Sequence, residues 1–88
     1  MSTDASWSVY ILKCADGTLY TGITPDLPRR LATHETGKGA KYTKGRGPFE
    51  MIFSESHPNK SSAARREAEI KSLNRNQKLN LVAQKLEN

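Results

Sequence analysis

Few side chains in this sequence can do chemistry, and those that can are spread along the chain. Cys14, His34 and His57 are its only thiol and imidazole groups, too few and too scattered for a structural zinc site. What remains is a pair of tyrosines, Tyr10 and Tyr20, with arginines in the next predicted helix and a carboxylate in a later one. Hydroxyl, guanidinium and carboxylate groups can hold a proton, a phosphate and a hard cation, provided that the fold brings them together.

The two tyrosines lie on segments that predict a β-hairpin. Residues 7–13 and 18–23 are rich in β-branched and aromatic side chains, and Asp16-Gly17 between them is a strong hairpin signal. A two-residue loop would put Tyr10 and Tyr20 on opposite faces of the hairpin. A three-residue loop, with its glycine in the left-handed conformation, would put them on the same face. We choose the second register because it makes the other face uniformly apolar: Trp7, Val9, Ile11, Leu19 and Ile23.

The segment after the hairpin predicts a helix. Asp26 is a typical N-cap residue, Pro28 is tolerated in the first turn, and Gly37 would end the helix. Arg30 and His34 are four residues apart, so they share one helix face, which we place close to the sheet.

Three further elements complete the prediction. Residues 49–54 alternate like a third strand that directs three side chains inward: Phe49, Met51 and Phe53. A helix capped by Ser61 or Ser62 would run to about Leu73. Residues 74–76 would then separate it from a last helix with three apolar residues: Leu79, Val82 and Leu86.

Length and composition limit the fold class. Eighty-eight residues, of which 35% are hydrophobic, support one small core, so we expect residues 1–6 to form a tail and residues 7–88 a single domain. The order ββαβαα predicts an α+β fold, a three-stranded antiparallel sheet with helices packed against it. One cysteine excludes an internal disulfide. No apolar run is long enough for a signal peptide or a membrane span, so we expect a cytoplasmic monomer with no membrane contact.

The net charge of +5 is concentrated in two segments. Residues 29–46 carry six basic side chains and one acidic one, and residues 60–88 carry seven and three. Residues 1–28 and 47–59 are each net negative. This distribution of positive charge favours binding to a polyanion, and nucleic acid is the natural candidate.

Three short motifs together resemble the GIY-YIG nuclease domain. Residues 8–10 (SVY) are followed ten residues later by residues 20–22 (YTG) and then by residues 26–31 (DLPRRL). Each motif alone is unspecific, but their order, the hairpin between the first two and the spacing of the arginines make the match specific. SVY departs from the first motif of the family in its first two residues. The resemblance covers residues 7–82 and is greatest with small, stand-alone bacterial members of uncharacterised function.

The resemblance implies a role for each matching side chain. The motif tyrosines fall on Tyr10 and Tyr20, the catalytic arginine falls on Arg30, and a histidine one turn later falls on His34. The metal-binding glutamate of the family falls on Glu67. Similar domains hydrolyse a phosphodiester with one divalent metal ion, so the resemblance implies Mg²⁺ or Mn²⁺.

The position of Glu67 can be checked on a helical wheel. At about 100° per residue, the apolar face that contains Ala63 and Ile70 also contains Glu67, whereas Glu69 falls outside it. A carboxylate on an apolar face needs a partner, because an unpaired buried charge costs several kcal/mol. A cation bound through one carboxylate, water and phosphate oxygens would satisfy it. An ion pair with Arg30 or a surface position of the carboxylate would do so equally well.

Tyr10 is the candidate general base. The ordinary pKa of a tyrosine, about 10, is too high for that role at neutral pH. We expect Arg30, the metal ion and nearby lysines to favour the phenolate and to lower the pKa of Tyr10. Tyr20 would orient water or phosphate through its hydroxyl. The alternative for both tyrosines is packing between neighbouring strands.

The basic segment that follows the first predicted helix could contact a nucleic-acid backbone and stack on one base, or remain a solvated loop. Its candidate binding residues, with one from the helix itself, are Arg29, Lys38, Lys41, Tyr42, Lys44 and Arg46.

The resemblance and the charge together predict a metal-dependent endonuclease that acts on DNA rather than RNA, including structured or damaged DNA in repair or recombination. One alternative is a nucleic-acid-binding module without catalysis. Another is a nuclease subunit that depends on a protein partner for targeting, because no separate recognition domain follows from the sequence pattern.

Overall fold

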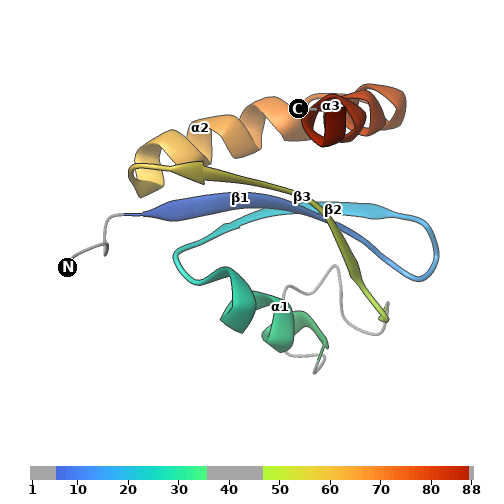
Figure 1. Cartoon of the computed structure of the whole chain (residues 1–88), viewed down its shortest axis with the longest axis horizontal. Coiled ribbons are helices and arrows are strands. Elements are labelled where there is room, and N and C mark those ends of the chain that lie inside the picture. The colour runs from blue at the N-terminus through green and yellow to red at the C-terminus, as the bar shows by residue number, and fades with distance from the viewer. Residues whose placement is uncertain (1–5, 36–46, 88) are drawn as a thin grey trace.

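A three-stranded antiparallel sheet separates the helices of this chain into two groups. The computed structural model describes residues 6–35 and 47–87, without the side chains of residues 86 and 87. The elements are β1 (Trp7–Lys13), β2 (Leu19–Thr24), α1 (Leu27–Glu35), β3 (Glu50–His57), α2 (Lys60–Lys71) and α3 (Arg75–Glu87). The strand order is β2-β1-β3, with α1 on one face and α2 and α3 on the other (Figure 1). The predicted α+β class and element order are confirmed.

The hairpin has the predicted three-residue loop. Tyr10 lies opposite Gly22 and Leu12 lies opposite Tyr20. Gly17 has a φ of 87°, the left-handed conformation that glycine adopts without steric cost. This register follows from the alternation of apolar side chains, because a shift by one residue would turn every apolar side chain to the wrong face.

The core lies between the sheet and the helices α2 and α3. Its buried members come from four elements: Val9, Ile11, Phe53, Ala63, Ile70 and Val82. The remaining side chains of the predicted apolar face, Trp7, Leu19 and Ile23, pack against this cluster. Of the apolar residues of the last helix, Val82 is buried and Leu79 is 38% exposed, whereas Leu81 packs against the cluster. Within the described ranges, no helix is long and apolar enough to cross a membrane.

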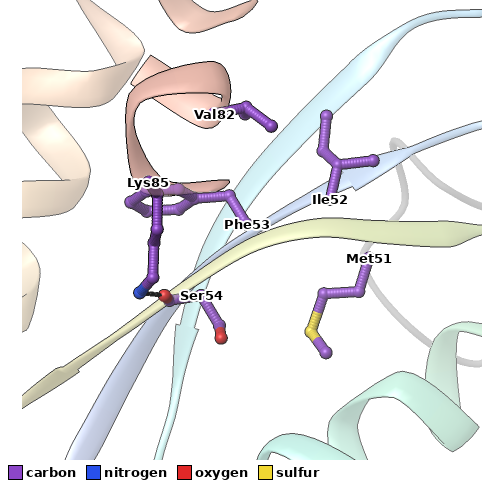
Figure 2. Close-up of a pocket in the computed structure, with 6 residues that line it drawn as sticks. All are labelled: Met51, Ile52, Phe53, Ser54, Val82 and Lys85. Atoms are coloured by element: carbon purple, nitrogen blue, oxygen red, sulfur yellow. Dashed lines mark hydrogen bonds between the residues drawn. The ribbon is translucent and has the colours of Figure 1, made fainter. Parts of the chain in front are cut away.

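The prediction that Phe49, Met51 and Phe53 share one inward face is wrong, because β3 contains a bulge. Ile11 pairs with Phe53 but Leu12 pairs with Met51, so Ile52 is the extra residue. The bulge turns Ile52 and Phe53 toward α3 and Met51 toward the other side, as Figure 2 shows. Met51 is 38% exposed. The strand itself also begins one residue later and ends three residues later than predicted.

Asparagines cap both C-terminal helices, and at α2 the cap is Asn59 rather than the predicted Ser61 or Ser62. The side chain of Asn59 accepts a hydrogen bond of 2.8 Å from the backbone N–H of Ser62 and caps α2, which ends at Lys71. Asn74 caps α3 in a reciprocal arrangement: its Oδ1 accepts from the N–H of Gln77, and its own N–H donates to Oε1 of Gln77. Asparagine and serine are about equally good N-caps, so propensity alone does not choose between neighbours.

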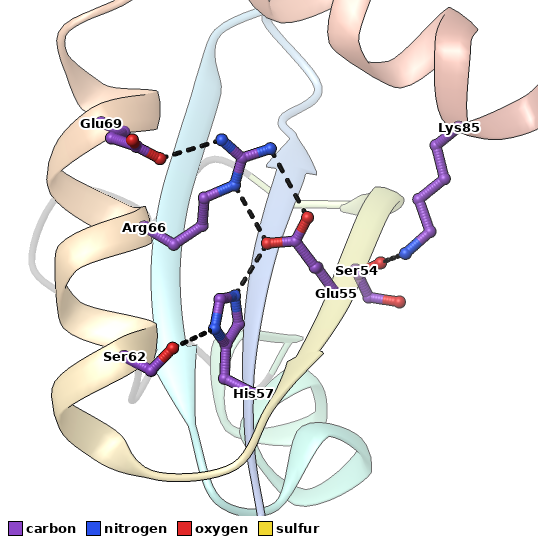
Figure 3. Close-up of polar contacts among 7 residues, drawn as sticks. All are labelled: Ser54, Glu55, His57, Ser62, Arg66, Glu69 and Lys85. Carbon is purple, nitrogen blue, oxygen red and sulfur yellow. Dashed lines mark hydrogen bonds and ion pairs between the residues drawn. The ribbon is translucent and has the colours of Figure 1, made fainter.

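A polar network fastens α2 to β3 (Figure 3). Glu55 on β3 accepts hydrogen bonds from His57 Nε2 at 2.8 Å and from Arg66 Nε at 3.0 Å. Arg66 also reaches Glu69 at 3.0 Å, and His57 Nδ1 lies 2.7 Å from the hydroxyl of Ser62. The partners come from the strand and the helix, so this cluster fixes where α2 begins over the sheet.

Candidate active site

Tyr10 is the centre of a cluster on the α1 face of the sheet. Its side chain is buried, and its hydroxyl lies 2.9 Å from Nε2 of His34 and 3.4 Å from Nε of Arg30. Asp26 caps α1 through a hydrogen bond of 3.2 Å from the N–H of Arg29, which sets the start of the helix. Arg30 and His34 then follow one turn apart on the sheet side, as predicted.

Gly22 makes room for the Tyr10 ring. A Cβ atom at position 22 would lie 2.6 Å from the hydroxyl oxygen and 2.8 Å from Cζ of Tyr10, distances that real Cβ atoms essentially never show. The ring therefore lies across β2, over the residue with which it pairs. A glycine opposite an aromatic residue in a strand marks such a close approach.

Tyr20 joins the same cluster from β2. Its ring centroid lies 6.3 Å from that of Tyr10 and 5.2 Å from that of His34, both in tilted or edge-on geometry. Phe49 also packs on His34, with 6.0 Å between the ring centroids. Hydrogen bonding to Tyr10 is the main cause that raises the pKa of Arg30, and Tyr20 adds to it. The structure thus brings four predicted residues together: Tyr10, Tyr20, Arg30 and His34.

Arg30 lowers the pKa of Tyr10, as expected, but the net shift caused by the described residues is upward. Burial disfavours the phenolate and raises the pKa of Tyr10, and this outweighs the hydrogen bond from Arg30, which lowers it. The neighbouring Tyr20 and Glu67 raise the pKa further. At neutral pH, Tyr10 is therefore a hydroxyl group that can both accept and donate a hydrogen bond.

His34 is neutral for a similar reason. Burial lowers the pKa of His34, and the positive charge of Arg30 lowers it further. Arg30 can only donate, so the oxygen of Tyr10 accepts from it. The hydroxyl hydrogen of Tyr10 is then available to a neutral His34, whose Nε2 can accept it at 2.9 Å.

Glu67 lies on α2, across the sheet from α1. Its side chain is 23% exposed, and its Oε2 lies 3.2 Å from Nζ of Lys71, one turn further along the helix. The partner of the carboxylate among the described residues is thus Lys71 and not Arg30. The charge of Glu67 still raises the pKa of Tyr10, so the two groups lie within electrostatic reach of each other. Glu69 is 68% exposed and pairs with Arg66, so its predicted outward position is confirmed.

The donor set suits a cation held by one protein carboxylate. In the part of the chain that the structure describes, no three His, Cys, Asp or Glu side chains form a metal-binding group. Glu67 is a half-buried carboxylate with one exposed ammonium group beside it, which another cation can replace. Mg²⁺ is commonly bound through one or two carboxylates, water and phosphate oxygens, so these residues fit such an ion.

Of the six residues predicted to bind the nucleic-acid backbone, Arg29 lies in the part of the chain that the structure describes. Lys38, Lys41, Tyr42, Lys44 and Arg46 lie outside the described residues. Arg29 is exposed on α1, next to the residue that contacts Tyr10.

Comparison with known families assigns the chain to a class. The GIY-YIG catalytic domain matches residues 6–80, which include the tyrosine cluster, α1, β3, α2 and the first half of α3. The chain belongs to the GIY-YIG family, a family of nucleases.

Within this family the chain is similar to small proteins named UPF0213. It is 56% identical over 75 residues to a UPF0213 protein of Natronomonas pharaonis, across 85% of this chain and 88% of the relative. It is 54% identical over 79 residues to one of Oceanobacillus iheyensis, across 90% and 92% of the two chains.

Two solution NMR structures share the fold. One is a UPF0213 protein from Bacillus halodurans, with a TM-score of 0.61 and 50% identity, across 91% of this chain and 85% of that chain. The other is a protein from E. faecalis, with a TM-score of 0.65 and 36% identity, across 100% and 95% of the two chains.

Sequence reasoning missed three residues near the site. Lys71 and Lys78 counted only toward the charge of the C-terminal segment, and the steric role of Gly22 was not foreseen. The signal for Gly22 was present, because a lone glycine opposite an aromatic residue in a predicted hairpin indicates close approach. Lys71 follows Glu67 by four residues, a helical ion-pair spacing that the sequence already contains, whereas no local signal marks Lys78, which α3 brings to β2 only in the folded chain.

Proposed function

We propose that this protein is a metal-dependent endonuclease that hydrolyses phosphodiester bonds in DNA. One observation carries the proposal: the hydroxyl of Tyr10 lies between a permanently charged guanidinium and a neutral imidazole. Simple packing of a tyrosine between strands requires neither group. Membership of a nuclease family supports the same conclusion.

The cluster handles a proton in two linked transfers. Tyr10 takes a proton from the attacking water as its own proton passes to Nε2 of His34, so that no free phenolate has to form beforehand. This route suits the raised pKa of Tyr10 and the lowered pKa of His34, because each group stays neutral until the reaction begins. The hydroxyl of Tyr20 orients the water or the phosphate.

Arg30 stabilises the negative charge that develops on the phosphate oxygens. Its planar guanidinium matches two phosphate oxygens, and hydrogen bonds to the tyrosines hold it in place before substrate arrives. Glu67 would hold the divalent ion, Mg²⁺ or Mn²⁺, which supplies Lewis-acid polarisation of the phosphate and stabilisation of the leaving oxygen. Lys71 holds the Glu67 carboxylate in position when the ion is absent.

Nicking of supercoiled plasmid DNA by the purified protein tests the proposal. The wild type should nick in Mg²⁺ or Mn²⁺ and not after chelation. Glu67→Gln should abolish nicking, and Arg30→Ala should reduce its rate by about 10²–10³-fold. Glu69→Gln is the matched control, because Glu69 lies on the same helix but points away from the sheet, and it should nick like the wild type.

Each outcome separates the candidate functions. Equal nicking by the wild type and Glu67→Gln would point to a contaminating nuclease and contradict the proposal. Salt-dependent DNA binding without nicking, with every metal tested, would favour the binding-module alternative. Nicking that appears only after a cell extract is added back would favour a partner-dependent subunit.

A further inference from the structure

A cavity of about 300 Å³ lies at the free edge of β2, next to the site and bordered on one side by the tyrosine cluster. Its walls are formed by Leu19, Tyr20, Thr21, Lys71 and Lys78. Leu19 and Thr21 belong to the face of β2 that packs toward α2, whereas Tyr20 belongs to the opposite face. The cavity therefore follows the edge of the sheet and connects its two sides.

Two of its wall residues also belong to the candidate active site. Tyr20 stacks within the cluster that contains Tyr10 and His34. Lys71 is the ion-pair partner of Glu67. A chain of phosphates that passes from the tyrosine cluster toward Glu67 would thus run along this edge.

Lys78 gives the cavity wall a positive charge. Lys78 is half-buried in the cavity wall, and no carboxylate pairs with it among the residues that the structure describes. It lies at the start of α3, whose first turn contains no acidic residue and whose backbone dipole adds positive potential. Lys71 also lines the cavity, and its ammonium group is paired with the carboxylate of Glu67.

A buried polar atom in the wall also lacks a partner. The hydroxyl of Thr21 is buried, and it makes no hydrogen bond within the described part of the chain. Most buried polar groups in proteins are paired, so this hydroxyl is an exception, but its oxygen has almost no accessible surface and does not itself contact an occupant of the cavity.

We propose that this cavity binds a DNA backbone phosphate that flanks the cleaved one. The proposal rests on the function proposed above and adds a second contact for the same substrate. Lysine ammonium groups act as point charges for a phosphate, and Leu19 provides an apolar surface for the adjoining sugar. The contact is made to the backbone, so it is independent of base sequence.

Binding of Lys78→Gln to duplex DNA tests this site. Lys78 is the informative position because Lys71 also pairs with Glu67. With metal chelated, the dependence of log Kd on log salt should become shallower by about 0.9 per lost phosphate contact. Arg65→Gln removes one positive charge from an exposed position of α2 outside the cavity and should leave the dependence unchanged. In nicking assays, the loss in Lys78→Gln should fall on KM rather than on kcat.

The results distinguish this proposal from the proposed function. If Lys78→Gln binds with the slope of the wild type while the wild type nicks DNA, the cavity is not a phosphate site and the nuclease proposal stands. If the slope falls in Lys78→Gln but no protein nicks, the phosphate site stands and the nuclease proposal fails. Equal slope changes in Lys78→Gln and Arg65→Gln would overturn the site, because net charge alone would then explain the binding.

Discussion

Replacing Gly22 by alanine should disable the site by displacing a single hydroxyl group. The added Cβ would meet the hydroxyl oxygen of Tyr10 at 2.6 Å, Cζ of Tyr10 at 2.8 Å and Cε2 of Tyr20 at 3.1 Å. Ordinary contacts begin at 3.4 Å, so the hydroxyl must retreat by about 0.8 Å. The Tyr10 ring is buried, and it has no flexible end that could move aside cheaply.

The size of the effect follows from that displacement. The contact with Arg30 is already 3.4 Å long, and the contact with His34 is 2.9 Å, so a shift of this size breaks or misaligns at least one of them. A misplacement of about 1 Å at a reacting group costs on the order of 10²-fold in rate. Crowding a well-packed position costs about 1–3 kcal/mol of unfolding free energy.

The assay compares plasmid nicking and urea unfolding in Gly22→Ala and in Gly17→Ala. Gly17 has a positive φ, and a Cβ added there would meet no atom within 4 Å, so alanine costs about 1–2 kcal/mol through the backbone alone and leaves the site intact. We expect both variants to lose stability but only Gly22→Ala to lose about 10²-fold in nicking rate. Wild-type nicking by Gly22→Ala, at concentrations where it is folded, would refute the assigned role of Tyr10.

Three further predictions concern titration and packing. Burial alone would raise the pKa of Glu55, but hydrogen bonds from His57 and Arg66 outweigh it and leave the pKa below the ordinary 4.5. The stability that Glu55 adds is therefore present above pH 4.5 and is lost as the pH falls through its folded pKa. The difference in unfolding free energy between the wild type and Glu55→Gln, measured in urea, should shrink in that range. NMR titration should give His34 a pKa below 6.5, because burial and the charge of Arg30 disfavour its protonated form. The contribution of His34 to stability should therefore fall as the pH drops below 6.5. A titration midpoint above 6.5 would contradict the neutral imidazole. Thr21→Val removes an unpaired buried hydroxyl and should leave the melting temperature unchanged or raise it by up to about 8 °C, whereas a clear fall would show that the hydroxyl has a partner.

The local features of this fold could be predicted because they depend on short stretches of chain. The hairpin register follows from Asp16-Gly17 and from strict alternation on both sides of it, and the start of α1 follows from Asp26. The shared face of Arg30 and His34 follows from helical periodicity. Together these features predict that the tyrosines, the arginine and the histidine form one cluster.

Features that depend on contacts between distant segments could not be predicted in the same way. The bulge at Ile52 depends on how β3 pairs with β1, so the alternation of residues 49–54 predicted the wrong face for Phe49 and Met51. Asn59 caps α2 because the network of Glu55, His57 and Arg66 fixes where the helix meets the sheet.

The amino-acid sequence by itself determined which side chains lie near one another along β1, β2 and α1, because strand and helix periods are local rules. Only the tertiary structure decided their chemistry. Burial raises the pKa of Tyr10 against the charge of Arg30, and α2 packs on the face of the sheet opposite α1, so Glu67 pairs with Lys71 of its own helix rather than with Arg30. The desolvation of a group depends on all the segments that bury it, and Tyr10 is buried by α1 and β2 together.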